Sequence, residues 1–453
     1  MNEQRPLPDW IAAILSAGKI YEVGGTVRDR LLGSTAVGQK DADYLVCKVP
    51  MPQLQRLLRR FGIVNLVGRS FGVIKFTPHD APGMTHDLAL PRRERSTGQR
   101  HTDYEVDYDS DLPVETDLLR RDFTINAIAE DCETGGIIDP ANGRADIAAR
   151  TLRLVFPRAF DEDPLRILRG AQFAARFGLS IDPATKDAMA RAAGQIATVS
   201  MERVAEELSK LMTLAPCPSV GLKLLQEIGV VRELLPELEA TVGVEQPGGY
   251  HAYDVFVHTL HTIDACAPRL RLRWAALLHD INKPQCRVVD GDKATFYGHE
   301  KRGSRTAARV LRRLRYPHDV ADAVATLVDK HMFTGSVADK GLRRLIRRVG
   351  VDLIYDLLDL RRADVIAQGK GGNTLDIDEL ERNITSEIGR KAPFGRADLA
   401  INGDDLRHEL GLMPGPELGR IIDELVEAVL DDPLANDRAK LFEIARNKIS
   451  RND

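Results

Sequence analysis

The chain has 453 residues, 43% of them hydrophobic and 29% charged, and it carries a net charge of −4. That length exceeds what one hydrophobic core supports, so we expect several domains, and the charge excludes a uniformly basic coat for nucleic acid. No apolar run approaches the ~18 residues of a membrane span, and the five scattered cysteines indicate neither a disulfide framework nor a thiolate zinc site. The N-terminal MNEQRPLPDW lacks the basic-then-apolar pattern of a signal peptide, so we expect a cytoplasmic protein without membrane contact.

Residues 1 to about 140 mix helical and strand patterns. Apolar residues at 11, 14 and 15 predict a helix, IYEVGG (20–25) a strand, TVRDRLLG (26–33) a helix closed by Gly33, and FGVIKF (71–76) another strand. KDADYLVC (40–47) is typical of a further strand. The polar, charged segment from Leu90 to Asp111 predicts a mobile loop.

From about residue 150 the pattern is almost wholly helical. Apolar residues recur at helical spacing in PLRILRGAQFAARFG (164–178), MERVAEELSKLM (201–212) and PELGRIIDELVEAVL (416–430). The sequence therefore predicts an α/β head followed by a long helical body.

Arginine outnumbers lysine 47 to 16 and occurs in clusters. Guanidinium forks suit phosphate groups, although a GC-rich genome produces the same bias. The clusters are Arg92, Arg93 and Arg95; Arg120 and Arg121; Arg312, Arg313 and Arg315; and Arg343, Arg344, Arg347 and Arg348.

Two carboxylates, Asp41 and Asp43, stand at the start of the 40–47 strand. Side chains at i and i+2 share a face about 6–7 Å apart, where two anions repel each other. A solvated strand end explains the pair without a ligand, whereas a divalent cation carrying phosphates explains it as a site. The Gly24-Gly25 turn sixteen residues upstream favours the second reading, because it suits a phosphate cradle that Arg28 can reach.

These segments resemble the polymerase-β-like nucleotidyltransferases, specifically the class II tRNA nucleotidyltransferase and bacterial poly(A) polymerase family. GGTVRD and DADY carry the resemblance first. LLRRDFTINAIA (118–129), IIDPANGRADIAARTLR (137–153), FDEDPLRILRGAQFAARFG (160–178) and SMERVAEELSKLM (200–212) follow in the family's order. The resemblance implies an α+β fold, with a polymerase-β-like head of mixed sheet and helices before an elongated all-α body.

The resemblance also implies roles for individual residues and the partners tRNA, CTP and ATP. Asp41 and Asp43 would be catalytic and would hold Mg²⁺. The nucleotide-binding residues would be Gly24, Gly25, Arg28, Arg121, Asp122, Asn126, Asp163, Arg166 and Arg169.

The helix that begins near Pro164 has two readings. Asp163 as N-cap and a Glu162–Arg166 ion pair explain its charged residues structurally. Arginine donors beside the Asp163 acceptor also match the Watson–Crick edges of cytosine and adenine, and they mismatch uracil and guanine. The family uses Asp163 and Arg166 in this second way, so the helix would select CTP and ATP without a template.

A second constellation of metal-binding residue types lies in the body. It comprises His258, His279, Asp280, His299, His331 and Asp364. A lone His-Asp pair at a helix end is usually just a satisfied terminus, but imidazole and carboxylate together suit Zn²⁺, Ni²⁺, Mn²⁺ or Mg²⁺. The remaining histidines, including His251, His261 and His318, we treat as structural or surface residues.

The set resembles the HD phosphohydrolase superfamily, with Asn282 in the glycine position of its HDxGKP motif. Asp280 would bridge two ions, one held by His258, His279 and Asp364 and the other by His299 and His331.

Three functions remain open. The stretch Val67–Phe76 resembles the CCA-adding type more than the basic run of poly(A) polymerases, and a full-length loop after Leu90 favours complete CCA over CC addition. The leading prediction is CCA addition to tRNA plus a phosphatase or 2′,3′-cyclic phosphodiesterase activity. The alternatives are a poly(A) polymerase and a nucleotide-sensing HD hydrolase that does not polymerise, although a sensor needs no pair of metal-binding carboxylates.

The predicted domains are a nucleotidyltransferase head (1–140), a neck with the base-template helix (141–213), a helical body with the HD domain (214–390) and a helical, tRNA-binding tail (391–453).

Overall fold

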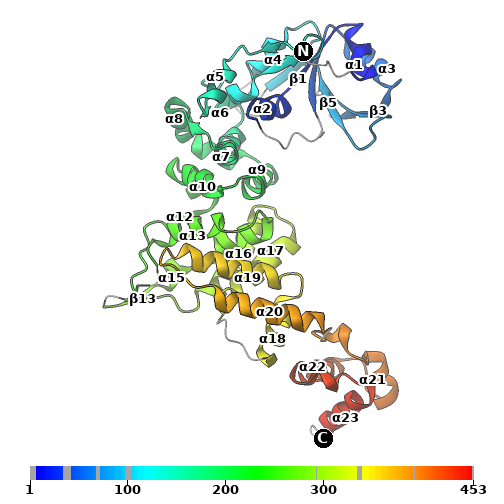
Figure 1. The fold of residues 1–453 in the computed structure, drawn as a ribbon, viewed down its shortest axis with the longest axis vertical. Helices are drawn as coiled ribbons and strands as arrows, with labels where there is room; N and C mark the ends of the chain where they lie inside the picture. Colours follow the sequence, from blue (N-terminus) through cyan, green and yellow to red (C-terminus); the bar gives the residue numbers. More distant parts are fainter. Residues whose placement is uncertain are drawn as a thin grey trace. The chain divides into compact units, whose positions relative to one another are not determined.

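The computed structural model describes residues 7–33, 42–67, 72–96, 104–249, 251–291, 293–333, 339–390 and 393–450. The chain folds as two compact units, which are Met1–Leu211 with Ala215–Leu234 and Met212–Leu214 with Leu235–Asp453. Figure 1 shows the strands confined largely to the first unit. The four predicted domains divide the chain more finely and stay a prediction. None of the helices in the described part of the chain has both the length and the apolar character needed to span a bilayer.

A mixed sheet forms the centre of the head. Its described strands are, in spatial order, β3 (Gly62–Val67), β4 (Val73–Pro78), β5 (His86–Ala89), β2 (Asp43–Cys47), β1 (Lys19–Val23), β8 (Ala129–Asp131) and β9 (Ile137–Ile138). Neighbouring strands are antiparallel except β2 and β5, which are parallel. The strands expected near 20–25, 40–47 and 71–76 are confirmed as β1, β2 and β4.

Both faces of this sheet are buried, because the apolar residues of β1 and β2 alternate between two cores. Ile20 and Val46 pack in one core with Trp10, whereas Leu45 packs in the other with Leu118. The helices of the head are α1 (Asp9–Leu15), α2 (Gly25–Leu31), α3 (Met51–Leu58) and α4 (Val114–Leu118).

The expected loop from Leu90 to Asp111 is in part a β-hairpin, so that prediction was wrong. Strands β6 (Arg92–Ser96) and β7 (Tyr104–Tyr108) pair antiparallel, with Arg93 opposite Asp107. Strand β6 (RRERS) has no apolar residue, whereas β7 (YEVDY) alternates apolar and polar residues over five positions. The sequence therefore held a short strand signal for β7, and hydrophobic periodicity gave none for its partner β6.

A helical neck completes the first unit. Its elements are η1 (Thr124–Asn126), α5 (Gly143–Ala148), β10 (Thr151–Leu152), α6 (Ala159–Glu162), α7 (Leu165–Phe177), β11 (Ser180–Ile181), α8 (Pro183–Ala192), η2 (Ala193–Thr198), α9 (Met201–Leu214), α10 (Pro218–Glu227) and α11 (Val230–Leu234). The Asp139 carboxylate starts α5 by accepting the Gly143 and Arg144 N–H groups at 2.7 and 2.9 Å. A Cβ at Gly143 would meet the Thr124 carbonyl oxygen at 2.1 Å, so only glycine lets α5 lie against η1.

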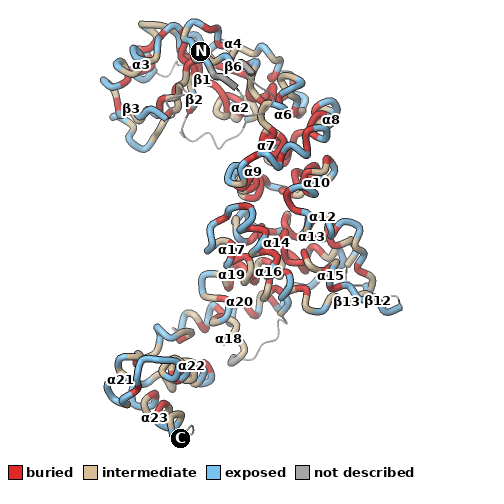
Figure 2. Tube along the Cα trace, turned by 180° about the vertical axis from the view of Figure 1, so that it is seen from behind, coloured by how far each residue is buried: buried red, intermediate tan, exposed pale blue. Residues whose placement is uncertain are grey.

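The second unit is built around one helix that is buried on all sides. Every residue of α14 (Leu270–Leu278) from Leu272 onward is buried, and Figure 2 shows this helix among the other buried segments. The surrounding elements are α12 (Pro236–Glu239), α13 (Val255–Asp264), α15 (Lys283–Cys286), β12 (Val288–Asp290), β13 (Lys293–Thr295), α16 (His299–Arg313), α17 (His318–Lys330), α18 (Asp339–Val349), α19 (Ile354–Ala367) and α20 (Leu375–Gly389). The expected body was all-α, so the β12–β13 hairpin is an addition to it.

The C-terminal part has its own small core. Its elements are η3 (Arg396–Asp398), α21 (Gly403–Leu410), α22 (Pro416–Asp431), η4 (Pro433–Ala435) and α23 (Arg438–Ile449). Leu406, Ile421, Leu425 and Leu441 are buried together between these helices.

Candidate functional site

The first candidate site lies at the turn between β1 and α2. Gly24 adopts φ 76°, and the register pairs Val23 with Asp43, so the turn and the carboxylate share one edge of the sheet. A Cβ at Gly24 would lie 3.1 Å from Asp43 Oδ2 and 3.3 Å from Arg121 Nη1, so glycine allows the close approach. Asp41 lies outside the described residues, and the predicted carboxylate pair is therefore represented here by Asp43.

One cavity of about 460 Å³ in the first unit is lined by residues of both the head and the neck helices. Among its lining residues are Gly24, Gly25, Arg28, Asp43, Arg121, Asp122, Asn126, Asp163, Arg166 and Arg169. These are all the described residues for which the sequence predicted nucleotide binding or catalysis in the head, and the structure brings them to one cavity. Their individual roles stay predictions.

The template helix begins one residue later than expected. Helix α7 starts at Leu165, after Pro164, and Asp163 Oδ1 accepts the Leu165 N–H at 3.2 Å. Asp163 Oδ2 accepts a bond from Arg203 Nη2 at 2.7 Å, and Arg166 pairs with Glu162 at 3.5 Å. The predicted structural contacts are thus present, while Asp163 and Arg166 still face the cavity.

Arg28 is held firmly inside the protein. Its guanidinium donates to Asn126 Oδ1 at 2.8 Å and pairs with Asp29 at 2.6 Å. It also lies 5.0 and 4.5 Å from the ring centroids of Phe173 and Phe177. Burial lowers the pKa of Arg28, and the charge of Asp29 opposes that shift. These contacts orient the guanidinium toward the cavity.

Asp122 uses both of its oxygens within the protein. Oδ1 accepts bonds from Asn126 Nδ2 at 2.9 Å and from the Phe123 N–H at 2.8 Å, while Oδ2 accepts one from Arg169 Nε at 2.8 Å. Burial raises the pKa of Asp122, but the charge of Arg169 and these hydrogen bonds outweigh it, so the pKa lies below its ordinary value. Asp122 thus contacts Arg169 and Asn126 and also lines the cavity, and its predicted role in holding the nucleotide stays a prediction.

The second candidate site lies in the second unit, where five helices meet. His279 and Asp280 follow the buried helix α14 directly, and His299 is the first residue of α16. The other three, His258, His331 and Asp364, lie within α13, directly after α17 and within α19. All six side chains are buried. The apolar helices therefore carry polar groups into the core.

Each histidine of this cluster turns the same ring nitrogen inward. The Nδ1 atoms of His279, His299 and His331 lie 2.8, 2.8 and 2.7 Å from the carbonyl oxygens of Ala276, Phe296 and Val328. His258 Nδ1 lies 3.3 Å from the Ala367 carbonyl oxygen. A carbonyl accepts only a protonated nitrogen, so each neutral ring presents an unprotonated Nε2 to the cluster, as a metal ligand does.

The inward atoms form two groups. His258, His279 and Asp364 make one, Asp280, His299 and His331 the other, and within each group the ligand atoms lie within 4.8 Å of one another. Asp280 reaches both groups, since Oδ2 lies 3.1 Å from His279 Nε2 and Oδ1 lies 3.3 Å from His299 Nε2. This grouping matches the predicted division with Asp280 as the bridge.

These groups fit divalent cations. The Nε2 atoms of His258 and His279 are buried without a hydrogen-bond partner in the described part of the chain. Burying such atoms unsatisfied costs free energy, which a cation between them removes. Burial alone raises the pKa of Asp280, but His279 and Lys283 hold it well below its ordinary value, so the carboxylate is charged and ready to bind metal.

A cavity of about 560 Å³ opens onto this cluster. Asp280, His299, His331 and Asp364 line it, together with Lys283. Asn282, which replaces the usual glycine, has φ −100° and ψ 6°, a backbone conformation available to any residue. The substitution therefore does not strain the loop after Asp280.

Three segments of the chain match known family models. Residues 20–153 match the model "Poly A polymerase head domain", and residues 178–241 match "Probable RNA and SrmB-binding site of polymerase A". Residues 300–445 match a model of tRNA nucleotidyltransferase domain 2.

Curated relatives cover most of the chain. It is 38% identical to the multifunctional CCA protein of Pseudomonas paraeruginosa over 322 residues, which are 69% of this chain and 74% of the relative. It is 40% identical to that of Methylobacillus flagellatus over 321 residues, with 69% and 73% covered. The chain belongs to the multifunctional CCA protein family. It is therefore a class II nucleotidyltransferase, and family membership implies a divalent metal in the head.

Solved structures share the fold. The CCA-adding enzyme of Bacillus stearothermophilus in complex with CTP matches with a TM-score of 0.71 at 24% identity over 98% of both chains. The Thermotoga maritima CCA-adding enzyme complexed with tRNA-CCA matches with a TM-score of 0.56 at 19% identity over 98% of this chain and 97% of that one. The predicted fold class, a mixed-sheet head followed by a largely helical body, is confirmed.

Sequence reasoning missed three residues that the structure adds to these sites. Asp87 stands opposite Asp43 across the parallel β2–β5 pair and lines the head cavity, as does Arg203. His251, expected to be structural or on the surface, lines the HD cavity with its ring 4.7 Å from that of His258. An acidic residue on the FGVIKF-to-HDLAL hairpin was the available signal for Asp87, but only strand pairing brings it to Asp43.

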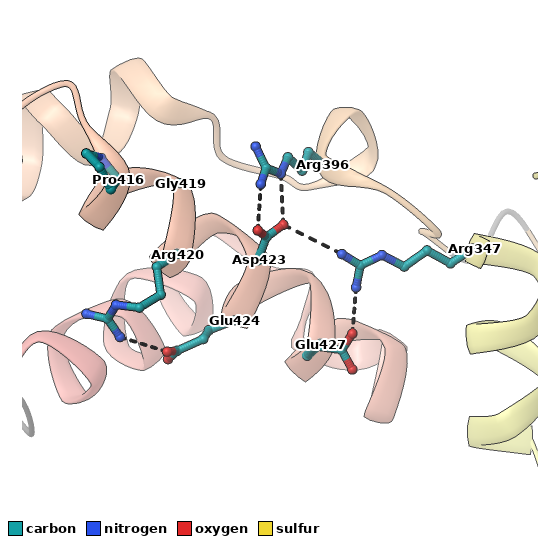
Figure 3. A pocket seen from close by; sticks show the side chains of 8 residues that line it. All are labelled: Arg347, Arg396, Pro416, Gly419, Arg420, Asp423, Glu424 and Glu427. Atoms are coloured by element: carbon teal, nitrogen blue, oxygen red, sulfur yellow. Dashed lines mark hydrogen bonds and ion pairs between the residues drawn. The ribbon is translucent and has the colours of Figure 1, made fainter. Parts of the chain in front are cut away.

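The arginine cluster of α18 gives no support to a phosphate site. In the cleft of Figure 3, Arg396 makes two bonds to Asp423 at 2.9 and 2.6 Å, and Arg347 pairs with Glu427 at 2.6 Å. Arg420 pairs with Glu424 at 2.8 Å. All three pair with carboxylates of α22, and Arg344 of the α18 cluster pairs with Glu427 and Asp431 of the same helix.

Proposed function

We propose that this chain adds CCA to the 3′ end of tRNA from CTP and ATP in the head cavity, and that its HD cluster is a metal-dependent phosphohydrolase. The observation that carries the first half is that one cavity contains both Asp43 and the Asp163–Arg166 pair. The metal-binding carboxylate and the residues that select the base then act on the same nucleotide. The names of the relatives, multifunctional CCA proteins, support the same conclusion.

In the head, Asp43 and Asp41 are the ligands for Mg²⁺, with Asp87 beside Asp43 at the same sheet edge. Bound Mg²⁺ supplies charge stabilisation to the triphosphate and lowers the pKa of the attacking hydroxyl. The Gly24-Gly25 turn lets the phosphate chain approach the backbone. Arg121, which lies beside Gly24, and Arg28 provide the positive charge for the triphosphate.

Base selection follows from the donors and acceptors of α7. Arg166 donates toward the ring nitrogen and Asp163 accepts from the amino group, a pattern that cytosine and adenine share. The bond from Arg203 to Asp163 and the ion pair between Arg166 and Glu162 hold this edge in one orientation. A rigid protein edge then selects the base that a template strand selects in other polymerases.

CCA addition is favoured over poly(A) addition by the relatives that cover two thirds of the chain and are named CCA proteins. Residues 68–71 of the discriminating Val67–Phe76 stretch lie outside the described residues. A nucleotide sensor without polymerisation needs no carboxylate at the Gly-Gly turn, so Asp43 in the cavity speaks against it.

For the HD cluster we propose Ni²⁺, Mn²⁺ or Mg²⁺ as the metal and a terminal phosphate or 2′,3′-cyclic phosphate of RNA as the substrate. Such ends lack the free 3′-hydroxyl that nucleotide addition needs, so the hydrolase would restore the acceptor. The inward Nε2 atoms and the bridging position of Asp280 support the two-metal arrangement. We further propose that the tail from residue 391 binds tRNA and that the enzyme works in the cytoplasm, with its substrates.

The test offers purified protein a tRNA without its CCA end, CTP and ATP, and sequences the products. Complete CCA ends support the proposal, whereas oligo(A) tails or unchanged tRNA contradict it. A parallel assay on a 2′,3′-cyclic nucleotide with Mg²⁺, Mn²⁺ or Ni²⁺ tests the HD cluster. His279→Ala must abolish that hydrolysis and leave CCA addition intact, and an unaffected His279→Ala hydrolase would refute the assignment.

A further inference from the structure

Two cationic side chains line the HD cavity, and they are engaged very differently. Lys283 Nζ forms an ion pair with Asp280 Oδ2 at 2.7 Å and donates to Gln246 Oε1 at 2.6 Å, and it lies 5.3 Å from the centroid of the Phe296 ring. An ammonium group has three donors, and these contacts occupy most of its surroundings. Lys283 is therefore committed to holding the bridging carboxylate.

Arg361 is the second cation. It stands three residues before Asp364 on α19, on the same face of the helix, and its side chain is 22% exposed. Its Nη1 donates to Asp364 Oδ2 at 2.6 Å, while Asp364 Oδ1 lies 3.1 Å from His258 Nε2. The guanidinium thus sits on the outer side of the Asp364 carboxylate, at the wall of the cavity.

Most of the guanidinium donors remain available. A guanidinium has five N–H groups, and within the described residues the bond to Asp364 is the one contact that engages Arg361. Glu300 also lines the cavity, and its negative charge repels an entering phosphate. A cation in the cavity wall is therefore needed to bind the phosphate. The planar fork matches two phosphate oxygens at once.

We propose that Arg361 binds the phosphoryl group of the substrate at the HD centre, an inference that rests on the proposed phosphohydrolase function. The guanidinium contacts the Asp364 carboxylate on one side. On its other side it binds the oxygens of the phosphoryl group that point away from the metal site. Arg361 is then a substrate-binding residue, and it sets the affinity of the HD centre for phosphate groups.

The test measures binding rather than turnover. Every protein carries Asp43→Asn, so that the head does not hold metal and phosphate. Equilibrium dialysis with ³²P-labelled inorganic phosphate at saturating Mn²⁺ gives the phosphate Kd, and the electron paramagnetic resonance signal of free Mn²⁺ gives the metal Kd. The variants are Arg361→Gln, Arg361→Lys and, as a matched control, Arg362→Gln, because Arg362 pairs with Asp359 and Asp378 and does not line the cavity.

We expect Arg361→Gln to weaken phosphate binding by at least about tenfold at saturating Mn²⁺, since charged hydrogen bonds are lost. Arg362→Gln should bind phosphate as the parent does, and Arg361→Lys should fall between. Parent-like phosphate binding in Arg361→Gln would overturn the inference, as would a variant that loses only Mn²⁺ affinity, because Arg361 would then merely position Asp364. If Arg361→Gln does not fold, parent-like binding by Arg361→Lys overturns it. A parent that binds Mn²⁺ but no phosphate instead refutes the phosphohydrolase itself.

Discussion

His299 and His331 approach each other through identical atoms: their Nε2 nitrogens lie 3.3 Å apart, while each Nδ1 faces a backbone carbonyl oxygen. With both Nδ1 atoms protonated, two lone pairs point at each other. Burial, together with the neighbouring His279, lowers the pKa of His331 to about 3, so His331 itself takes up no proton at neutral pH. A cation bound by both Nε2 atoms removes the repulsion between them.

Metal removal should therefore destabilise the second unit. Trp274 lies buried in α14, directly before the cluster, and the other tryptophan, Trp10, belongs to the head. In a Trp10→Phe background, denaturant unfolding followed by Trp274 fluorescence should give a free energy of unfolding higher by about 2.7 kcal/mol at a Mn²⁺ concentration of 100 times its Kd.

His331→Ala is the control for this stabilisation. It removes one of the two facing nitrogens, so the metal-free protein no longer contains their repulsion. The increase in the free energy of unfolding on adding Mn²⁺ should therefore be smaller than in wild type. An equal Mn²⁺ effect in wild type and His331→Ala would show that the metal acts elsewhere.

Asp43→Asn should abolish nucleotide addition and leave hydrolysis by the HD centre unchanged. The carboxylate lies at the Gly24 turn in the first unit, whereas the HD cluster lies in the second. Incorporation of labelled CMP into tRNA lacking CCA measures the first activity, and hydrolysis of a 2′,3′-cyclic nucleotide measures the second. Asp80→Asn, an exposed site, is the matched control. Near-normal CMP incorporation by Asp43→Asn would refute the assignment.

Arg166→Ala should relax the choice of base more than it weakens tRNA binding. Its donors face the cavity, and each directional pairing that is lost should cost about 1–3 kcal/mol of discrimination between CTP and UTP. The ratio of kcat/KM for the two nucleotides gives that value, and tRNA affinity is measured separately. An unchanged ratio means that Arg166 only makes its contacts to Glu162 and to the Ala159 and Arg120 carbonyl oxygens.

The buried Asp122–Arg169 pair predicts a pH-dependent stability. The pKa of Asp122 is lower in the fold than its ordinary value, because Arg169 and the hydrogen bonds outweigh burial. Its contribution is therefore fully present above the unfolded pKa of about 4 and is lost as pH falls through the folded pKa. Asp122→Asn should cost about 1–2 kcal/mol at pH 7, since Arg169 loses its 2.8 Å charged contact and keeps the longer one to Glu207 at 3.9 Å.

The measurement follows Trp10 fluorescence in a Trp274→Phe background, so that it reports on the first unit. The stability gap between wild type and Asp122→Asn should narrow steadily as the pH is lowered from 5 toward 2. A gap that stays constant over that range would show that ionised Asp122 contributes nothing to stability.

Local patterns in the sequence were sufficient for much of both sites. The strand, glycine turn and helix around Gly24 follow from short-range conformational preferences. The HD cluster was indicated by the types of its ligands and their order along the chain, which resemble those of the HD superfamily.

Long-range pairing was beyond the reach of those patterns. Asp87 reaches Asp43 only because β2 and β5 pair in parallel, and the charged strand β6 is recognised as a strand only through its backbone pairing with β7. Arg344 and Arg347, from a cluster that suggested phosphate binding, are ion-paired with α22, since a charge run says nothing about which carboxylates a distant helix presents.

The sequence by itself determined where the helix ends and turns with candidate site residues lie, because local backbone conformation depends on neighbours within a few positions. The tertiary structure alone decided which of them share a cavity. It brought Asp163 of the neck to Asp43 of the head, turned the Nε2 atoms of His299 and His331 toward each other, and left Arg361 facing the HD cavity. These relationships arise from the packing of apolar faces, and the polar groups reach their partners only when those faces are buried together.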